Sequence, residues 1–170
     1  MPARTLLIAA LSLLAAPAAA QETESYNLSF AVRSAVFGIC EDVLAGQFDM
    51  NDAKALWVYH LTPESDAEET ELRKQYRSIE SARGSFDDGQ VLVGYINGDH
   101  CTVHFQGSAQ EAVRQKVLDQ MAASGAEHQH EVNELGEYDK FEFDKAHIGV
   151  QVVDKTHSIT IIVTSAAADQ

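Results

Sequence analysis

Four of the seven histidines occur in two pairs whose spacing is compatible with metal binding. His100 and His104 lie in one predicted strand, and His128 and His130 lie in another. Side chains alternate between the two faces of a strand, so the members of each pair share a face. Imidazole nitrogens bind Zn²⁺ and Cu²⁺, and Glu131 beside the second pair adds a carboxylate. If the two strands are neighbours, the four histidines form a metal site.

This spacing is not specific for zinc or copper, because polar residues on a solvated strand face show the same pattern. We therefore expect no metal site and no cofactor. A periplasmic protein that binds Zn²⁺ or Cu²⁺ through these four histidines is kept as an alternative function.

Motifs for nucleophilic catalysis do not occur in the sequence. It has no Gly-x-Ser-x-Gly elbow, no Ser-x-x-Lys, no His-Glu-x-x-His and no glycine-rich phosphate loop. The acidic runs fit helix starts and turns, such as Asp87-Asp88-Gly89, better than a calcium-binding loop. A hydrolase needs only two well-placed carboxylates, so it is a second alternative with an acid–base pair not yet located. The favoured function is a non-enzymatic binding module.

The aromatic residues Phe48, Trp57 and Tyr59 are candidates for the lining of a groove. Aromatic side chains at this spacing belong to the core more often than to a binding site. We therefore predict that they are core residues.

The chain contains two cysteines, Cys40 and Cys101. Their separation is far longer than that of a redox-active Cys-x-x-Cys motif, and the acidic Glu41 and Asp42 disfavour a reactive thiolate at Cys40. An even number of cysteines in an exported chain favours a disulfide. Closing a loop of this length stabilises a fold by about 4 kcal/mol in the chain-entropy model.

The first twenty residues have the pattern of a cleaved signal peptide. Arg4 precedes an apolar run over 6–16, and Ala18 and Ala20 supply the small residues that a signal peptidase requires. The apolar run is shorter than the roughly 20 residues that span a bilayer. The sequence thus predicts export to the periplasm, a mature chain that begins at Gln21, and no membrane anchor.

Composition restricts the class of partner. The chain has 26 acidic and 12 basic residues, a formal net charge of −14. This charge excludes nucleic acid and anionic lipid as expected partners, since both are bound mainly through lysine and arginine. The partner is expected to be a protein or small molecule of the periplasm. The acidic surface also favours a soluble monomer.

Hydrophobic periodicity and turn residues predict one α+β domain over 21–165, followed by a frayed tail over 166–170. Helices are expected at 27–44, 51–59, 65–79 and 108–125. Strands are expected at 91–96, 100–106, 127–135, 138–144, 148–153 and 158–164. The connections are mostly too short for parallel crossovers, so the sheet is expected to be mainly antiparallel, in the order ββαβββ(β), with the N-terminal helices on one face.

Two local features set the predicted faces. Asn97-Gly98 fits a two-residue type I′ turn, which places His100 opposite Tyr95. The histidine face is then expected to lie under the helix that a capping box starts at Ser108. Cys101 lies on the other face of its strand, so a disulfide to the buried stripe of the first helix pins that helix to the sheet.

Overall fold

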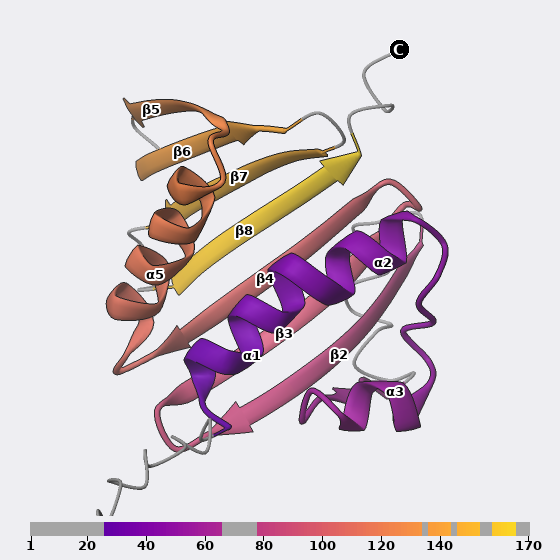
Figure 1. Ribbon diagram of the computed structural model, residues 1–170. Coiled ribbons are helices and arrows are strands. Elements are labelled where there is room, and N and C mark those ends of the chain that lie inside the picture. The colour runs from indigo at the N-terminus through magenta and orange to yellow at the C-terminus, as the bar shows by residue number, and fades with distance from the viewer. Residues whose placement is uncertain (1–25, 66–77, 134–135, 144–145, 154–157, 166–170) are drawn as a thin grey trace, which may run out of the picture.

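Within the part of the chain that the structure describes, eight strands form one antiparallel sheet, and the helices lie on one of its faces (Figure 1). The structure is a computed structural model that describes residues 26–65, 78–133, 136–143, 146–153 and 158–165. The predicted α+β class is confirmed, as is the mainly antiparallel sheet with helices on one face. The predicted signal peptide and tail lie outside the described residues.

The strands follow a simple topology of two meanders joined by a helix. Their bounds are β1 Thr62–Pro63, β2 Ile79–Phe86, β3 Gly89–Ile96, β4 His100–Gly107, β5 Glu127–Asn133, β6 Gly136–Glu142, β7 Ala146–Val153 and β8 Ser158–Ser165. The order across the sheet is β1-β2-β3-β4-β8-β7-β6-β5, and every neighbouring pair is antiparallel. Helix α5, Gln110–Ala123, connects β4 to β5.

A long N-terminal helical segment crosses the sheet. It consists of α1, Leu28–Ser34, a π-helical turn η1, Ala35–Ile39, and α2, Cys40–Leu44. The Asn27 side chain accepts a hydrogen bond from the Phe30 N–H at 2.9 Å and so caps the first turn. The side chains that face the sheet are buried: Leu28, Ala31, Val32, Ala35, Val36, Ile39, Cys40 and Val43. The helix predicted over 27–44 is confirmed.

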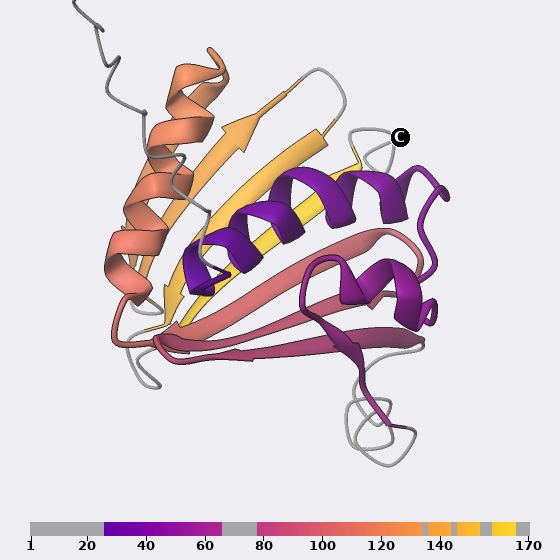
Figure 2. The ribbon, with the colours of Figure 1, turned by 60° about the horizontal axis from the view of Figure 1, so that its bottom comes forward.

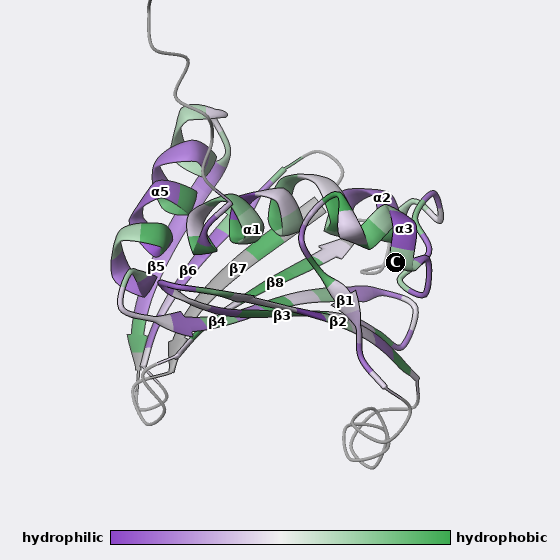
Figure 3. Ribbon diagram, turned by 90° about the horizontal axis from the view of Figure 1, so that it is seen from below, coloured by the Kyte–Doolittle hydropathy of each residue, from purple (hydrophilic) through white to green (hydrophobic). Residues whose placement is uncertain are grey.

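The core lies between the helices and the inner side of a curved sheet (Figure 2). The inner face of β3, β4 and β8 carries fully or almost fully buried apolar side chains: Val91, Val93, Cys101, Val103, Phe105, Ile159, Ile161 and Val163. Figure 3 shows hydrophobic and hydrophilic residues alternating along the helices, whereas β5 and β6 are mainly hydrophilic. The short helix α3, Ala53–Trp57, packs beside β1. None of the helices in the described residues is long and apolar enough to cross a membrane.

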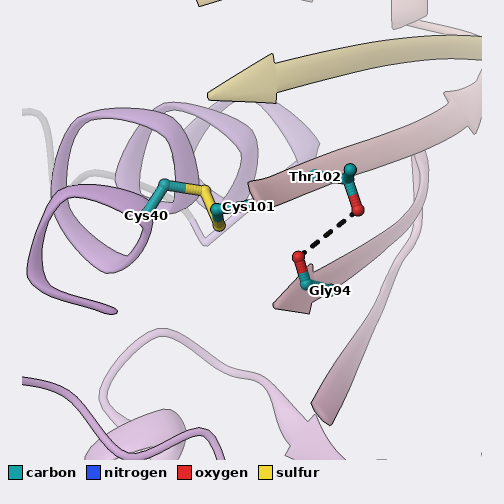
Figure 4. The surroundings of a disulfide bond; sticks show 4 residues. All are labelled: Cys40, Gly94, Cys101 and Thr102. Atoms are coloured by element: carbon teal, nitrogen blue, oxygen red, sulfur yellow. Dashed lines mark hydrogen bonds between the residues drawn. A yellow bond between two sulfur atoms is a disulfide. The ribbon is translucent and has the colours of Figure 1, made fainter. Parts of the chain in front are cut away.

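The predicted disulfide is present between Cys40 and Cys101. Both residues are fully buried, and their Cα atoms lie 5.4 Å apart, within the range of an ordinary disulfide. Figure 4 shows the disulfide bond joining α2 to β4. In the same view, the Thr102 hydroxyl donates a hydrogen bond to the Gly94 carbonyl of the neighbouring strand β3. The disulfide therefore fixes the long helical segment on the sheet, as predicted.

The β3–β4 turn differs from the prediction by one residue. Asn97 and Gly98 both have positive φ, and the Asp99 N–H donates to the Ile96 carbonyl at 3.3 Å, as in a type I′ turn. The strand pairing, however, begins at Ile96 and His100, so Asp99 is an extra residue in the loop. A shift of one residue reverses the face on which each side chain lies. The predicted pairing of His100 with Tyr95 is therefore wrong.

Strand β2 is not among the expected strands, and it begins at Ile79, the last residue of the helix predicted over 65–79. Ile79 begins an eight-residue strand that pairs with the whole of β3. Most of the predicted helix, 66–77, lies outside the described residues. The strand has small residues where the molecule is crowded: a Cβ at Gly84 would lie 2.8 Å from Leu61 Cδ2, and Ala82 is fully buried. Packing, rather than a hydrophobic alternation visible in the sequence, makes this segment a strand.

Helix α5 matches the helix predicted over 108–125, but its predicted cap is wrong. The N-cap position is Ala109, which makes no side-chain capping bond. The Ser108 hydroxyl donates instead to the Asp88 carbonyl at 3.4 Å and so contacts the β2–β3 turn. Gly125, with φ of 78°, ends the helix as expected.

Candidate functional site

The four candidate metal-binding histidines do not meet. His100 and His104 lie on β4, and His128 and His130 on β5; β8, β7 and β6 separate these strands. At about 4.8 Å per strand the two pairs are roughly 19 Å apart. The first pair also lies on the face opposite buried Cys101, whereas the second lies on the face of α5. The alternative of a four-histidine metal site is therefore wrong.

No other group of three or more metal-binding side chains is found in the described residues. The outer-face histidines have local polar partners instead. His100 Nδ1 lies 2.5 Å from Asp99 Oδ1, and His104 Nδ1 lies 3.0 Å from Thr160 Oγ1. Burial, followed by the positive charge of Arg83, lowers the pKa of His104 from its ordinary value. This shift favours the neutral imidazole of His104. The helices α2 and α5 pack on the other face of β4, so the prediction that the histidine face lies under the helix begun at Ser108 is wrong.

The second histidine pair belongs to a charged cluster between α5 and the β5–β6 hairpin. The Asp139 carboxylate is buried, and its Oδ1 lies 3.0 Å from His128 Nε2 and 2.8 Å from His130 Nδ1. Its Oδ2 accepts a hydrogen bond from Arg114 Nη2 at 3.0 Å. Burial alone would raise the pKa of Asp139, but the hydrogen bonds from the two histidines and the charge of Arg114 outweigh it and lower the pKa.

This cluster is built to hold the fold together. Arg114 also pairs with Glu111 of its own helix at 3.0 Å and with Glu137 of β6 at 3.2 Å. The His128 ring stacks on Phe141 with 4.4 Å between centroids. Both carboxylate oxygens of Asp139 already have hydrogen-bond partners. The Arg114 guanidinium also places positive charge where a metal ion would have to bind. We therefore assign the cluster a structural role.

A pocket with a different chemistry lies where the start of α1, the end of α3 and the β2–β3 turn meet. Its volume is about 640 Å³, within the range of small-molecule sites. The residues that line it include Tyr26, Trp57, His60, Phe86, Asp87 and Asp88. Aromatic rings and carboxylates from three separate segments of the chain thus face one space.

Three rings are in contact along one wall of this pocket. The Tyr26 and His60 centroids lie 3.7 Å apart, and those of Trp57 and His60 lie 5.9 Å apart with 26° between the planes. Trp57 nevertheless has 72% of its surface exposed, and Tyr26 has 56%. Trp57 is therefore not a core residue, which corrects the prediction. Tyr59, in contrast, packs against the core as predicted.

The backbone around the acidic wall is tightly packed. Asp88 Oδ1 accepts a hydrogen bond from the Leu28 N–H at 3.0 Å, which ties the start of α1 to the β2–β3 turn. A Cβ on Gly89 would lie 2.4 Å from the Gln106 carbonyl oxygen. Asp88 is thus held in place, while the Asp87 side chain makes no hydrogen bond or ion pair with the residues that the structure describes. The backbone of this wall is therefore fixed by packing and by the Leu28–Asp88 hydrogen bond.

No known protein family, curated protein or solved structure matches this chain. The candidate site therefore rests on geometry alone. Sequence reasoning considered Trp57 as a groove residue but favoured the core, and it interpreted Asp87-Asp88 only as a turn. No pattern in the sequence indicated Tyr26 or His60 as site residues. The single tryptophan of the chain, Trp57, was the one available hint.

Proposed function

We propose that the protein is an exported, disulfide-stabilised binding module whose ligand occupies the pocket between α1, α3 and the β2–β3 turn. The observation that carries the proposal is the exposed indole of Trp57 in a pocket lined by further rings and carboxylates. Binding pockets combine apolar and aromatic surface with a few fixed polar groups. Trp57 is 72% exposed, so a ligand that stacks on its indole would remove a large apolar surface from water.

The architecture supports a rigid scaffold for this site. The disulfide fixes the long helix that begins beside the pocket, and the hydrogen bond from Leu28 to Asp88 anchors the first turn of that helix. Disulfides persist in oxidising compartments, and the N-terminal segment has the pattern of a signal peptide. Together these features support a module that works outside the cytoplasm.

Trp57 itself provides the test of binding. Because the chain has a single tryptophan, its emission reports directly on the pocket. The protein purified after export, with its disulfide intact, is titrated with three probes of different charge: choline, cellobiose and benzoate. We expect at least one probe to change the emission saturably at about millimolar concentration. If none of the three does so, the pocket is not a ligand site.

Two variants localise the effect. Tyr26→Ala removes a ring that lines the pocket, and Val58→Ala removes an apolar side chain that is 62% exposed but is not among the lining residues. We expect weaker binding of the active probe for the first variant and no change for the second. Equal loss in both variants would mean that the probe binds non-specifically to the exposed apolar surface of this region.

Export is tested separately by fractionation of expressing Gram-negative cells and by intact mass. We expect the protein in the soluble periplasmic fraction, with the mass of a chain that begins at Gln21. A full-length mass in the inner-membrane fraction would contradict the proposed location without affecting the pocket.

A further inference from the structure

We infer that the ligand of this pocket is an organic cation with an alkylammonium or guanidinium head group, an inference that rests on the proposed binding function. Its basis is the combination of exposed aromatic rings and carboxylates in one pocket of an acidic protein. Each of these features favours positive charge for its own physical reason.

The rings provide the first reason. The face of an indole or phenol ring carries partial negative charge and attracts a cation within about 6 Å of its centroid. Trp57 and Tyr26 each contact the His60 ring, yet both keep more than half of their surface exposed. Much of each ring is therefore accessible to a ligand. Among side chains, tryptophan is the strongest partner for a cation.

The carboxylates provide the second reason. Asp87 and Asp88 line the pocket from the β2–β3 turn, and the lining residues in the described part of the chain include no lysine or arginine. One oxygen of Asp88 accepts the Leu28 N–H, whereas Asp87 is free of hydrogen bonds and ion pairs with described residues. A cation in the pocket thus meets negative charge that no basic side chain of the lining neutralises.

The net charge of the whole molecule also favours a cationic ligand. A formal net charge of −14 produces a negative potential that concentrates cations and repels anions. The volume of about 640 Å³ accommodates a cationic head group together with part of the molecule that carries it. An anionic ligand is therefore disfavoured by both the local and the overall charge.

Choline and 3,3-dimethyl-1-butanol separate charge from shape, because they differ mainly by replacement of the quaternary nitrogen with carbon. Each is titrated at low salt into the protein purified after export, with Trp57 emission as the readout. We expect choline to bind about tenfold more tightly than its neutral isostere. We also expect its affinity to fall when sodium chloride is raised, since salt screens exposed charges.

A pair of charge variants locates the attraction. Asp87→Asn removes one charge from the pocket wall, and Glu41→Gln removes one from the exposed surface of α2, about 20 Å along the helical segment from Leu28. Both variants change the net charge equally. We expect choline binding to weaken about fivefold for Asp87→Asn and to change little for Glu41→Gln. Circular dichroism of both variants verifies that the fold is intact.

The outcomes distinguish this inference from the proposed function. Equal affinity for choline and its isostere, or equal effects of the two charge variants, overturns the cation inference. Saturable binding of cellobiose or benzoate without binding of choline also overturns it, but leaves the pocket as a binding site. If no probe changes Trp57 emission, the proposed function itself fails.

Discussion

The buried carboxylate of Asp139 and the guanidinium of Arg114 form an ion pair that joins β6 to α5, with 3.0 Å between Oδ2 and Nη2. Their side chains are 5% and 10% exposed, respectively. Because β5 and β6 are mainly hydrophilic, this edge of the sheet has few buried apolar side chains with which to hold the helix. The charged cluster takes over that role. Its contribution to stability can be measured directly.

We predict that Asp139→Asn lowers the free energy of unfolding by about 3 kcal/mol, because it leaves the buried Arg114 without its main counter-charge. Urea unfolding followed by circular dichroism measures the loss. Glu111→Gln is the matched control, since Glu111 contacts the same arginine but is 69% exposed. Its expected cost is below about 0.5 kcal/mol. Similar costs for both substitutions would show that burial of the pair is unimportant.

The same carboxylate predicts a specific acid sensitivity. The pKa of Asp139 is lower in the folded protein than its ordinary value of 3.8. A carboxylate with a lowered folded pKa stabilises the fold above its unfolded pKa, and this contribution is lost as pH falls through the folded value. The difference in unfolding free energy between the wild type and Asp139→Asn should therefore shrink between about pH 5 and pH 2. A constant difference across this range would contradict the prediction.

The parts of the fold that sequence reasoning predicted are those with a strong local pattern. The helical segment over 27–44 repeats its apolar residues at helical spacing, and a chain with two cysteines leaves only one pairing. Strand β2 has no such pattern, because Ser81, Ala82 and Gly84 owe their places to neighbouring strands and to crowding. Asp99 is a second example, because its residue type does not indicate that it adds a residue to the turn.

The pocket was beyond sequence reasoning for a different reason. Tyr26, Trp57 and Asp87 come from three segments that meet only because the long helix starts beside the β2–β3 turn and α3 packs next to β1. No spacing in the sequence encodes that meeting. The histidine pairs show the opposite case. Their spacing suggested a shared metal site, but the two pairs lie on opposite faces of the sheet.

The disulfide yields a third prediction. Replacement of both Cys40 and Cys101 by serine should lower the free energy of unfolding by about 4 kcal/mol, because the bond closes a loop of 61 residues in the unfolded chain. Urea unfolding of the variant and of the wild type measures this loss. A thiol assay on the denatured, unreduced wild type should detect no free cysteine. Two free thiols per chain would exclude the disulfide.

The last prediction compares Gly89, the first residue of β3, with Gly38 in the helical turn η1, because an added methyl group would meet very different surroundings at the two positions. At Gly89 a Cβ would lie 2.4 Å from the Gln106 carbonyl oxygen and 2.8 Å from Leu28 Cδ2. At Gly38, in the middle of the long helical segment, nothing lies within 4 Å. We expect Gly89→Ala to destabilise the fold by about 2 kcal/mol through backbone displacement. Gly38→Ala should stabilise it by about 0.5 kcal/mol, because alanine loses less backbone entropy on folding.

Urea unfolding gives both values, and choline binding adds a functional readout. Gly89 follows Asp88 directly, and its methyl group would displace Leu28, whose N–H anchors that carboxylate. Gly89→Ala should therefore weaken choline binding under conditions in which the protein remains folded, whereas Gly38→Ala should leave it unchanged. Unaltered binding by a folded Gly89→Ala variant would show that the packing around Asp88 does not position the acidic wall of the pocket.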